Sequence, residues 1–130
     1  MSPKIKAVCL ACIEPTVQRA VRRYLEGIGL LEDYYTTHRV PGGSFNIVST
    51  LRDIGAVVSH FGATRVFLFD HEDCFIYRSL GNDSEAAHIK SLKKAGRLIQ
   101  TTYPGVTEVR IFFMRKIPAG GGWKVEEVTE

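Results

Sequence analysis

Strand-like and helix-like hydrophobic patterns alternate along this chain of 130 residues. Each short apolar run typical of a strand is followed by a segment in which apolar residues recur every three to four positions, as on one face of a helix. The order is strand, helix, strand, helix, strand, helix, strand. This alternation predicts an α/β fold with three layers, α/β/α, in which helices cover both faces of a mostly parallel sheet of four to five strands.

The strand-like runs differ in composition. The segment 4–12 is continuously apolar from Ala7 onward, and residues 65–70 contain a compact apolar run. Such runs are typical of strands that are buried on both faces. Residues 33–40 are rich in aromatic and β-branched side chains and end at a Pro-Gly-Gly sequence, so we expect a more exposed strand followed by a loop. Residues 106–114 predict a fourth strand. Residues 123–128 follow three glycines and predict an edge strand or a tail.

Three amphipathic helices are expected between these strands. The first begins at Pro15, a favourable first helical residue, and ends near Gly27. From Asn46 onward, apolar residues recur at alternating spacings of four and three, which predicts the second helix. This helix ends at Gly62. The third begins at Ser84, a typical N-terminal capping residue.

Composition excludes several classes of protein. With 45% hydrophobic and 24% charged residues, the chain is typical of globular domains. The net charge of +3 is too weak to indicate nucleic-acid binding. No run reaches the ~18 apolar residues of a membrane span, and the first segment lacks the pattern of a cleaved export signal. We therefore expect one cytoplasmic domain over residues 1–130, with no membrane and no nucleic-acid partner.

The three cysteines are an odd number in a chain without an export signal. This usage indicates free thiols, available for a metal or for catalysis, rather than disulfides. Cys9 and Cys12 cannot form a disulfide along a strand, because their Cα atoms would lie about 10 Å apart and the limit is about 7 Å. Cys9 is therefore expected to pack in the core.

Reactive side chains follow the ends of two predicted strands. Cys12 ends the first strand, and His71 and Cys74 follow the third. In a strand order 2-1-3-4 these ends are neighbours at the point where the strand order reverses, which is where α/β sheets bind ligands. Two thiolates and an imidazole suit zinc with an open fourth position. The residues alone equally allow two buried apolar cysteines and a capping histidine.

Three segments resemble the β-class carbonic anhydrases. Residues 11–17 (ACIEPTV) are similar to the Cys-x-Asp-x-Arg segment of that family, and residues 39–43 (RVPGG) to its Arg-Asn-Ala-Gly loop. Residues 51–74 resemble its helix, turn, strand and His-x-x-Cys sequence in the same order and at comparable spacing. The resemblance is clear over residues 4–74 and looser up to residue 114.

This resemblance implies a zinc-dependent carbonic anhydrase-like lyase, in which zinc-bound hydroxide converts CO2 reversibly to bicarbonate. It implies that Zn²⁺ is held by Cys12, His71 and Cys74. Glu14 would take the place of the aspartate that accepts a hydrogen bond from zinc-bound water. The resemblance further implies a homodimer or a higher homo-oligomer.

One position departs from the family pattern in a way that bears on function. The arginine that holds the acid in the family is replaced by Thr16, which carries no charge. Arg39 or Arg19 would then be needed to pair with Glu14, and Arg39 is a candidate catalytic residue. Alternatively, Glu14 binds zinc as the fourth ligand, and the protein is a structural or regulatory zinc-binding relative. Hydrolysis of COS or CS2 is a further possibility.

The loop after the second strand is expected to contribute to an anion pocket. Thr16, Gly42 and Gly43 would line this pocket, where backbone N–H groups could hold the anionic product. A nucleotide or phosphate binder that uses the same loop with Ser44 is a weaker alternative, because no phosphate-binding glycine motif follows any predicted strand.

A chain of this length leaves apolar surface that is hard to bury alone. Tyr34, Tyr35 and the strand segment 111–114 are therefore expected to form a surface for a partner copy.

Overall fold

The computed structural model describes residues 5–129, and its centre is a five-stranded sheet in the order β2-β1-β3-β4-β5. The first four strands are parallel and the last is antiparallel to β4. The strands are β1 (Ala7–Ala11), β2 (Tyr35–Arg39), β3 (Arg65–His71), β4 (Glu108–Lys116) and β5 (Trp123–Val128). The predicted order 2-1-3-4 is confirmed, and the edge strand extends it. The predicted start of the first strand at Lys4 lies outside the described residues.

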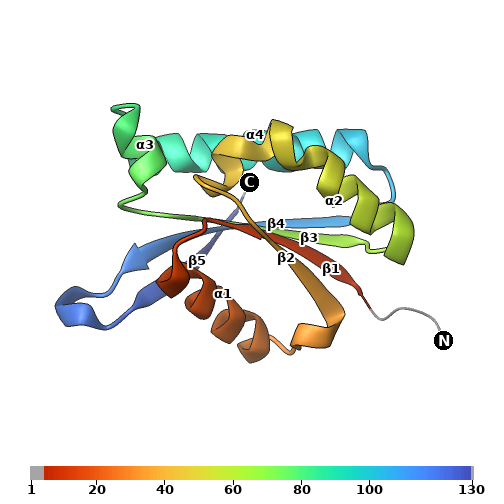
Figure 1. Ribbon diagram of the computed structural model, residues 1–130, viewed down its shortest axis with the longest axis horizontal. Coiled ribbons are helices and arrows are strands. Elements are labelled where there is room, and N and C mark those ends of the chain that lie inside the picture. The colour runs from red at the N-terminus through yellow and green to blue at the C-terminus, as the bar shows by residue number, and fades with distance from the viewer. Residues whose placement is uncertain (1–4, 130) are drawn as a thin grey trace.

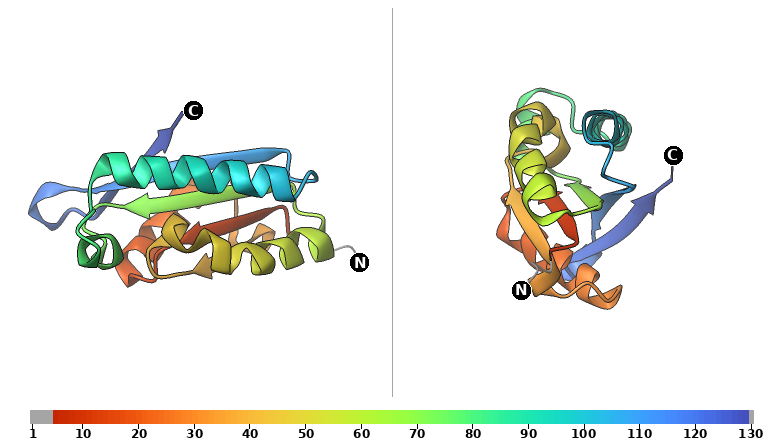
Figure 2. Two further views of the ribbon diagram at one scale, coloured as in Figure 1. Left: turned by 90° about the horizontal axis from the view of Figure 1, so that it is seen from above. Right: turned by 90° about the vertical axis from the view of Figure 1, so that its right-hand side faces the viewer.

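Helices cover both faces of the sheet, which confirms the predicted three layers. α1 (Pro15–Gly27) lies against one face, and α2 (Ile47–Phe61) and α4 (Glu85–Thr102) lie against the other (Figures 1 and 2). Gly62 ends α2, and the Ser84 side chain accepts a hydrogen bond from the Ala87 amide at the start of α4, as their residue types predict. Short elements were not predicted: α3 (Phe75–Ser79) and the 3₁₀ turns η1 (Glu32–Tyr34), η2 (Gly43–Asn46) and η3 (Pro118–Gly120).

The core has two layers, because successive residues of a strand point to opposite faces of the sheet. Cys9 and Phe67 pack beneath α1, and Leu10 and Leu68 pack beneath α2 and α4. Cys9 is 0% exposed and belongs to the first layer, as expected for a packing residue. Both faces of β1 and β3 are buried, which explains their nearly continuous apolar sequences.

The expectation of a partner surface at residues 111–114 was wrong. Ile111, Phe112, Phe113 and Met114 are all at most 4% exposed. They are buried within the molecule because β4 is hydrogen-bonded to β3 on one side and to β5 on the other, while the helices cover its faces. Tyr35 is also buried.

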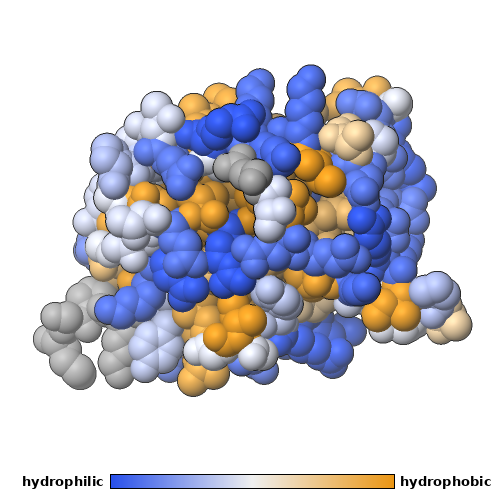
Figure 3. All heavy atoms as spheres, turned by 180° about the vertical axis from the view of Figure 1, so that it is seen from behind, coloured by the Kyte–Doolittle hydropathy of each residue, from blue (hydrophilic) through white to orange (hydrophobic). Residues whose placement is uncertain are grey.

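The outer surface is mixed in character. Seen from behind, hydrophilic side chains separate several smaller hydrophobic areas (Figure 3). Within residues 5–129, no helix combines the length and hydrophobicity that crossing a bilayer would require.

Gly43 allows the loop after β2 to pack directly on the end of β3. Its backbone has a φ of +54°, in the left-handed region that favours glycine. A Cβ at this position would lie 2.8 Å from Asp70 Oδ1 and 3.0 Å from the Phe69 carbonyl oxygen. The close approach of this loop therefore depends on the missing side chain.

Gly43→Ala should lower the free energy of unfolding by about 2 to 4 kcal/mol, since it adds a steric clash to the strain of a positive φ. Gly29→Ala is a matched control, because Gly29 has a φ of +87° and a Cβ added there would meet nothing within 4 Å. The control should cost only about 1 kcal/mol. Urea denaturation of the two variants measures the difference, and equal costs would contradict the proposed packing.

Candidate metal centre

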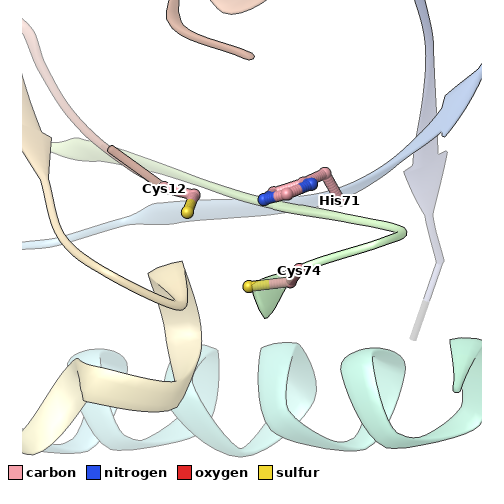
Figure 4. A group of neighbouring side chains, drawn as sticks. All are labelled: Cys12, His71 and Cys74. Carbon is pink, nitrogen blue, oxygen red and sulfur yellow. The ribbon is translucent and has the colours of Figure 1, made fainter. Parts of the chain in front are cut away.

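The pairing of β1 with β3 brings Cys12, His71 and Cys74 together. Leu10 and Leu68 are partners in the register, so Cys12, just after β1, lies near the end of β3, where His71 is the last residue. Cys74 is the N-terminal cap of α3. One ligand atom from each of the three side chains lies within 4.8 Å of the other two. Both sulfurs and one imidazole nitrogen face a common space (Figure 4).

The hydrogen bonds of His71 leave one ring nitrogen available. Nδ1 lies 2.7 Å from the backbone carbonyl oxygen of Glu72. A carbonyl oxygen can only accept, so Nδ1 carries the proton and Nε2 of the neutral ring has a lone pair. Nε2 is buried and has no hydrogen-bond partner among the described residues. This orientation of the ring, fixed by a bond on its other nitrogen, is typical of a histidine that binds a metal.

Backbone amides surround both thiol groups. Cys12 receives backbone hydrogen bonds from Glu14 and Gly42, and Cys74 receives them from Ile76 and Tyr77 in the first turn of α3. Hydrogen bonds from amides stabilise a thiolate more than a neutral thiol. Both cysteines are therefore in an environment that suits thiolate ligands, although each side chain is buried.

The pKa values of the two thiols are shifted in opposite directions. The Cys74 thiol lowers the pKa of Cys12 to about 3, although burial opposes this shift, and the neighbouring His71 ring lowers it further. The pKa of Cys74 is raised, because its thiol donates to Cys12 and because it is buried. Burial lowers the pKa of His71, but the interactions with Cys12 outweigh burial and the net shift is upward. Two thiols, an unpartnered imidazole nitrogen and a short mutual distance fit a zinc ion.

Glu14 lies beside this cluster without joining it. Its Oε1 accepts a hydrogen bond of 3.2 Å from the Thr16 hydroxyl. Its Oε2 lies 3.9 Å from Nδ1 of His71, which is the ring nitrogen that points away from the cysteines. The side chain of Glu14 is 42% exposed, whereas that of His71 is 2% exposed. In this arrangement Glu14 does not close the fourth position of the cluster.

The arginines considered as partners of Glu14 lie elsewhere. Within the described part of the chain, no ion pair joins Glu14 to Arg19 or Arg39. Arg19 and Arg39 instead line a surface pocket of about 440 Å³ between α1 and β2. The structure thus gives Glu14 a neutral hydroxyl partner, Thr16, in place of a guanidinium group.

The glycine loop is placed next to the cluster, but its amides have acceptors already. The Gly42 amide donates to Cys12, and the Gly43 amide donates to the Val40 carbonyl oxygen at 2.9 Å. Both glycines are buried. Their observed contacts therefore support the thiolate and the turn.

Sequence reasoning missed Trp123. Its indole Nε1 donates a hydrogen bond of 3.1 Å to the Thr16 hydroxyl oxygen. Its ring also meets the His71 ring edge to face, with 5.2 Å between the centroids. Only the antiparallel pairing of β5 with β4, in which Trp123 is the partner of Lys116, places it there. No spacing in the sequence connects this residue to Cys12, His71 and Cys74.

Sequence reasoning also missed the role of Asp70, directly before His71. The buried carboxylate accepts hydrogen bonds from the Ser44 amide at 2.9 Å, the Ser44 hydroxyl at 2.7 Å and the Tyr77 hydroxyl at 2.9 Å. Nδ1 of His88 lies 3.0 Å from Asp70, and Nε2 of His88 lies 2.8 Å from Asp83. This polar network joins η2, α3 and α4 to the end of β3.

Solved structures resemble the chain over nearly its whole length. A carbonic anhydrase from Glaciozyma antarctica aligns with 99% of this chain and 85% of its own, with a TM-score of 0.62 and 15% identity. A β-carbonic anhydrase from Trichomonas vaginalis aligns over the same shares, with a TM-score of 0.62 and 17% identity. The chain has the fold of the β-carbonic anhydrases. A carbon disulfide hydrolase aligns with 88% of this chain and 76% of its own, with a TM-score of 0.51 and 13% identity.

The likeness to the β-carbonic anhydrase fold is structural. No protein-family model matches the chain, and no curated protein matches it. The resemblance noted in three sequence segments is confirmed for the fold, and the chain is a short, divergent example of it.

Replacing Cys74 with Ser should reduce bound zinc from one equivalent to well below half, because a thiolate ligand is lost. Cys9→Ala is the matched control, since Cys9 is equally buried but lies in the core beneath α1. Metal analysis after dialysis measures both variants. Full zinc content in Cys74→Ser, or zinc loss in Cys9→Ala, would contradict this ligand set.

His88 should stabilise the protein in a pH-dependent manner. Burial lowers its pKa, but hydrogen bonds to Asp70 and Asp83 outweigh burial, so its pKa in the folded state is raised above the usual 6.5. The contribution of His88 to the free energy of unfolding is therefore complete below pH 6.5, and it is lost as the pH rises through the raised pKa of the folded state.

We expect His88→Asn to cost about 3 kcal/mol of unfolding free energy below this range and less above it. Urea denaturation across the pH range measures the difference. The exposed His60 provides the control, because His60→Asn should have a small effect at every pH. A cost for His88→Asn that grows with pH would contradict a charged histidine in the network.

Proposed function

We propose that this chain is a zinc-dependent lyase that converts CO2 and water reversibly to bicarbonate. The observation that supports this function most directly is the group of Cys12, His71 and Cys74, with Nε2 of His71 unpartnered, at the reversal point of the strand order. This is where a ligand site is expected in an open α/β sheet. We further propose that residues 1–130 act as one domain of this kind.

Cys12, His71 and Cys74 would hold the metal, since two thiolates and one imidazole leave a fourth position open. When bound, zinc supplies the Lewis acidity that makes water nucleophilic near neutral pH. The amides that donate to each sulfur would keep the thiolates in place and moderate their negative charge.

Glu14 would act as a hydrogen-bond acceptor beside the metal. The Thr16 hydroxyl donates a hydrogen bond of 3.2 Å to Oε1, and Oε2 has no hydrogen bond to any described residue. One oxygen is thus held and the other remains available to orient a donor near the cluster.

Positive charge near the first helix would attract the anionic product. Arg39 is the register partner of Ala11, one residue before Cys12, and shares its surface pocket with Arg19. We propose that Arg39 assists through this charge. Thr16, Gly42 and Gly43 would bound the space where substrate and product lie.

Exposed apolar side chains next to the metal centre suggest that a second copy covers it. Phe45, Phe75 and Leu80, on η2 and around α3, are 46%, 50% and 58% exposed. We propose a homodimer or higher homo-oligomer that buries this surface. The three free cysteines fit a reducing compartment, and we propose the cytoplasm.

A second candidate reaction is hydrolysis of CS2 or COS. The similarity to a carbon disulfide hydrolase favours including these substrates, which are linear and cumulated like CO2. The same residues would act in either reaction. A zinc protein without turnover, in which Glu14 rotates onto the metal, is the remaining alternative.

Stopped-flow measurement of CO2 hydration by the zinc-loaded protein tests the proposed function. We expect acceleration over buffer that falls at least about 100-fold in His71→Ala and about 10-fold in Glu14→Gln, with full zinc content in the second variant. Cys9→Ala should retain activity if it folds. Release of H2S from CS2 or COS without CO2 hydration would favour the hydrolase, and no turnover of any of the three substrates would contradict an enzymatic role.

A further inference from the structure

Trp123 joins the last strand to the candidate metal centre through two different contacts. Its indole Nε1 lies 3.1 Å from the hydroxyl oxygen of Thr16. Its ring lies 5.2 Å from the His71 ring, at an interplanar angle of 79°. One side chain therefore touches both a proposed ligand and the residue that holds Glu14.

The hydrogen bonds from Trp123 to Glu14 run in one direction. An indole N–H can only donate, so the Thr16 oxygen is the acceptor. An ionised carboxylate can only accept, so the Thr16 hydroxyl donates its single proton to Oε1 of Glu14, at 3.2 Å. The order is Trp123 to Thr16 to Glu14. Because Thr16 has one proton, the indole bond favours the rotamer in which that proton points at Glu14.

The ring of Trp123 is itself held from the β4 side. Lys116 Nζ lies 5.9 Å from the indole centroid, within the range of a cation–π contact. The same ammonium group pairs with Asp73 at 2.6 Å, and the Lys116 amide donates to the Glu72 carboxylate. Lys116 thus connects Trp123 to the loop that separates His71 from Cys74.

We infer that Trp123 is a positioning residue of the metal centre: its indole N–H orients Glu14 through Thr16, and its ring fixes the imidazole of His71. The part that concerns Glu14 rests on the proposed function. The part that concerns the hydrogen bonds and the ring contact holds for the protein with or without turnover.

The indole N–H gives a direct test in the metal-free protein. Trp123 is the one tryptophan in the sequence, so proton–nitrogen NMR shows a single indole resonance. Thr16→Val should move this resonance upfield and speed its exchange with water, because the acceptor is lost. Lys124→Ala, on an exposed neighbouring side chain, should leave it in place. An unmoved resonance in Thr16→Val would overturn the inference.

The cobalt-substituted protein tests the effect on the metal. Trp123→Phe keeps an aromatic ring and removes the donor. We expect this variant and Thr16→Val each to keep stoichiometric cobalt, alter its visible absorption and lower kcat/KM about 10-fold in the zinc form. The double variant should differ little from either single variant in its cobalt absorption and kcat/KM, because both substitutions interrupt the same chain of hydrogen bonds from Trp123 to Glu14.

The outcomes separate the two proposals. A cobalt spectrum of Trp123→Phe identical to that of the unmodified protein, or additive effects in the double variant, would overturn the positioning role. Absence of turnover in the unmodified zinc protein would contradict the proposed function, while the indole resonance and the cobalt spectrum would still decide the role of Trp123.

Discussion

The parallel pairing of β1 with β3 is the constraint on which the rest of the site depends. These strands are separated in sequence by α1, β2 and α2, yet they are neighbours in the sheet, with β2 on the other side of β1. The chain therefore reverses its direction of strand addition between them. Their carboxyl ends meet at this reversal. Cys12, just after β1, and His71, the last residue of β3, therefore lie close together.

A buried carboxylate then fixes the surroundings of that meeting point. Asp70 precedes His71 on β3 and binds groups from η2, α3 and α4. A buried carboxylate without such partners would be strongly destabilising, so each of these elements must dock for the charge to be tolerated. Docking of α3 brings Cys74, its N-terminal cap, to Cys12 and His71. Docking of η2 places the Gly42 amide against Cys12. The same contacts thus stabilise the fold and hold the candidate metal centre together.

The layered fold could be predicted from periodicity. Residue types at the strand ends made a cluster of Cys12, His71 and Cys74 one of two interpretations, and the resemblance to the β-carbonic anhydrases favoured that cluster. The position of Trp123 beside the site could not be predicted. It depends on the antiparallel pairing of β5 with β4 across a glycine turn, and no sequence spacing relates Trp123 to Cys12, His71 or Cys74. The five residues of α3 are too few to show helical periodicity. The burial of β4 was misjudged for a related reason: local sequence does not show that β5 covers its edge. The pairing of Glu14 with Thr16 was considered from the sequence, but the hydrogen bond from Trp123 to Thr16 was not.

X-ray absorption spectroscopy of the zinc-loaded protein tests the central claim most directly, since it measures the ligands of the metal itself. We expect two sulfur ligands at about 2.3 Å and two nitrogen or oxygen ligands at about 2.0 to 2.1 Å, one of them from imidazole. The sulfur count should fall to one for the zinc that Cys74→Ser retains, and it should stay at two in Cys9→Ala. A zinc site without sulfur, or with three sulfurs, would contradict a centre formed by Cys12, His71 and Cys74.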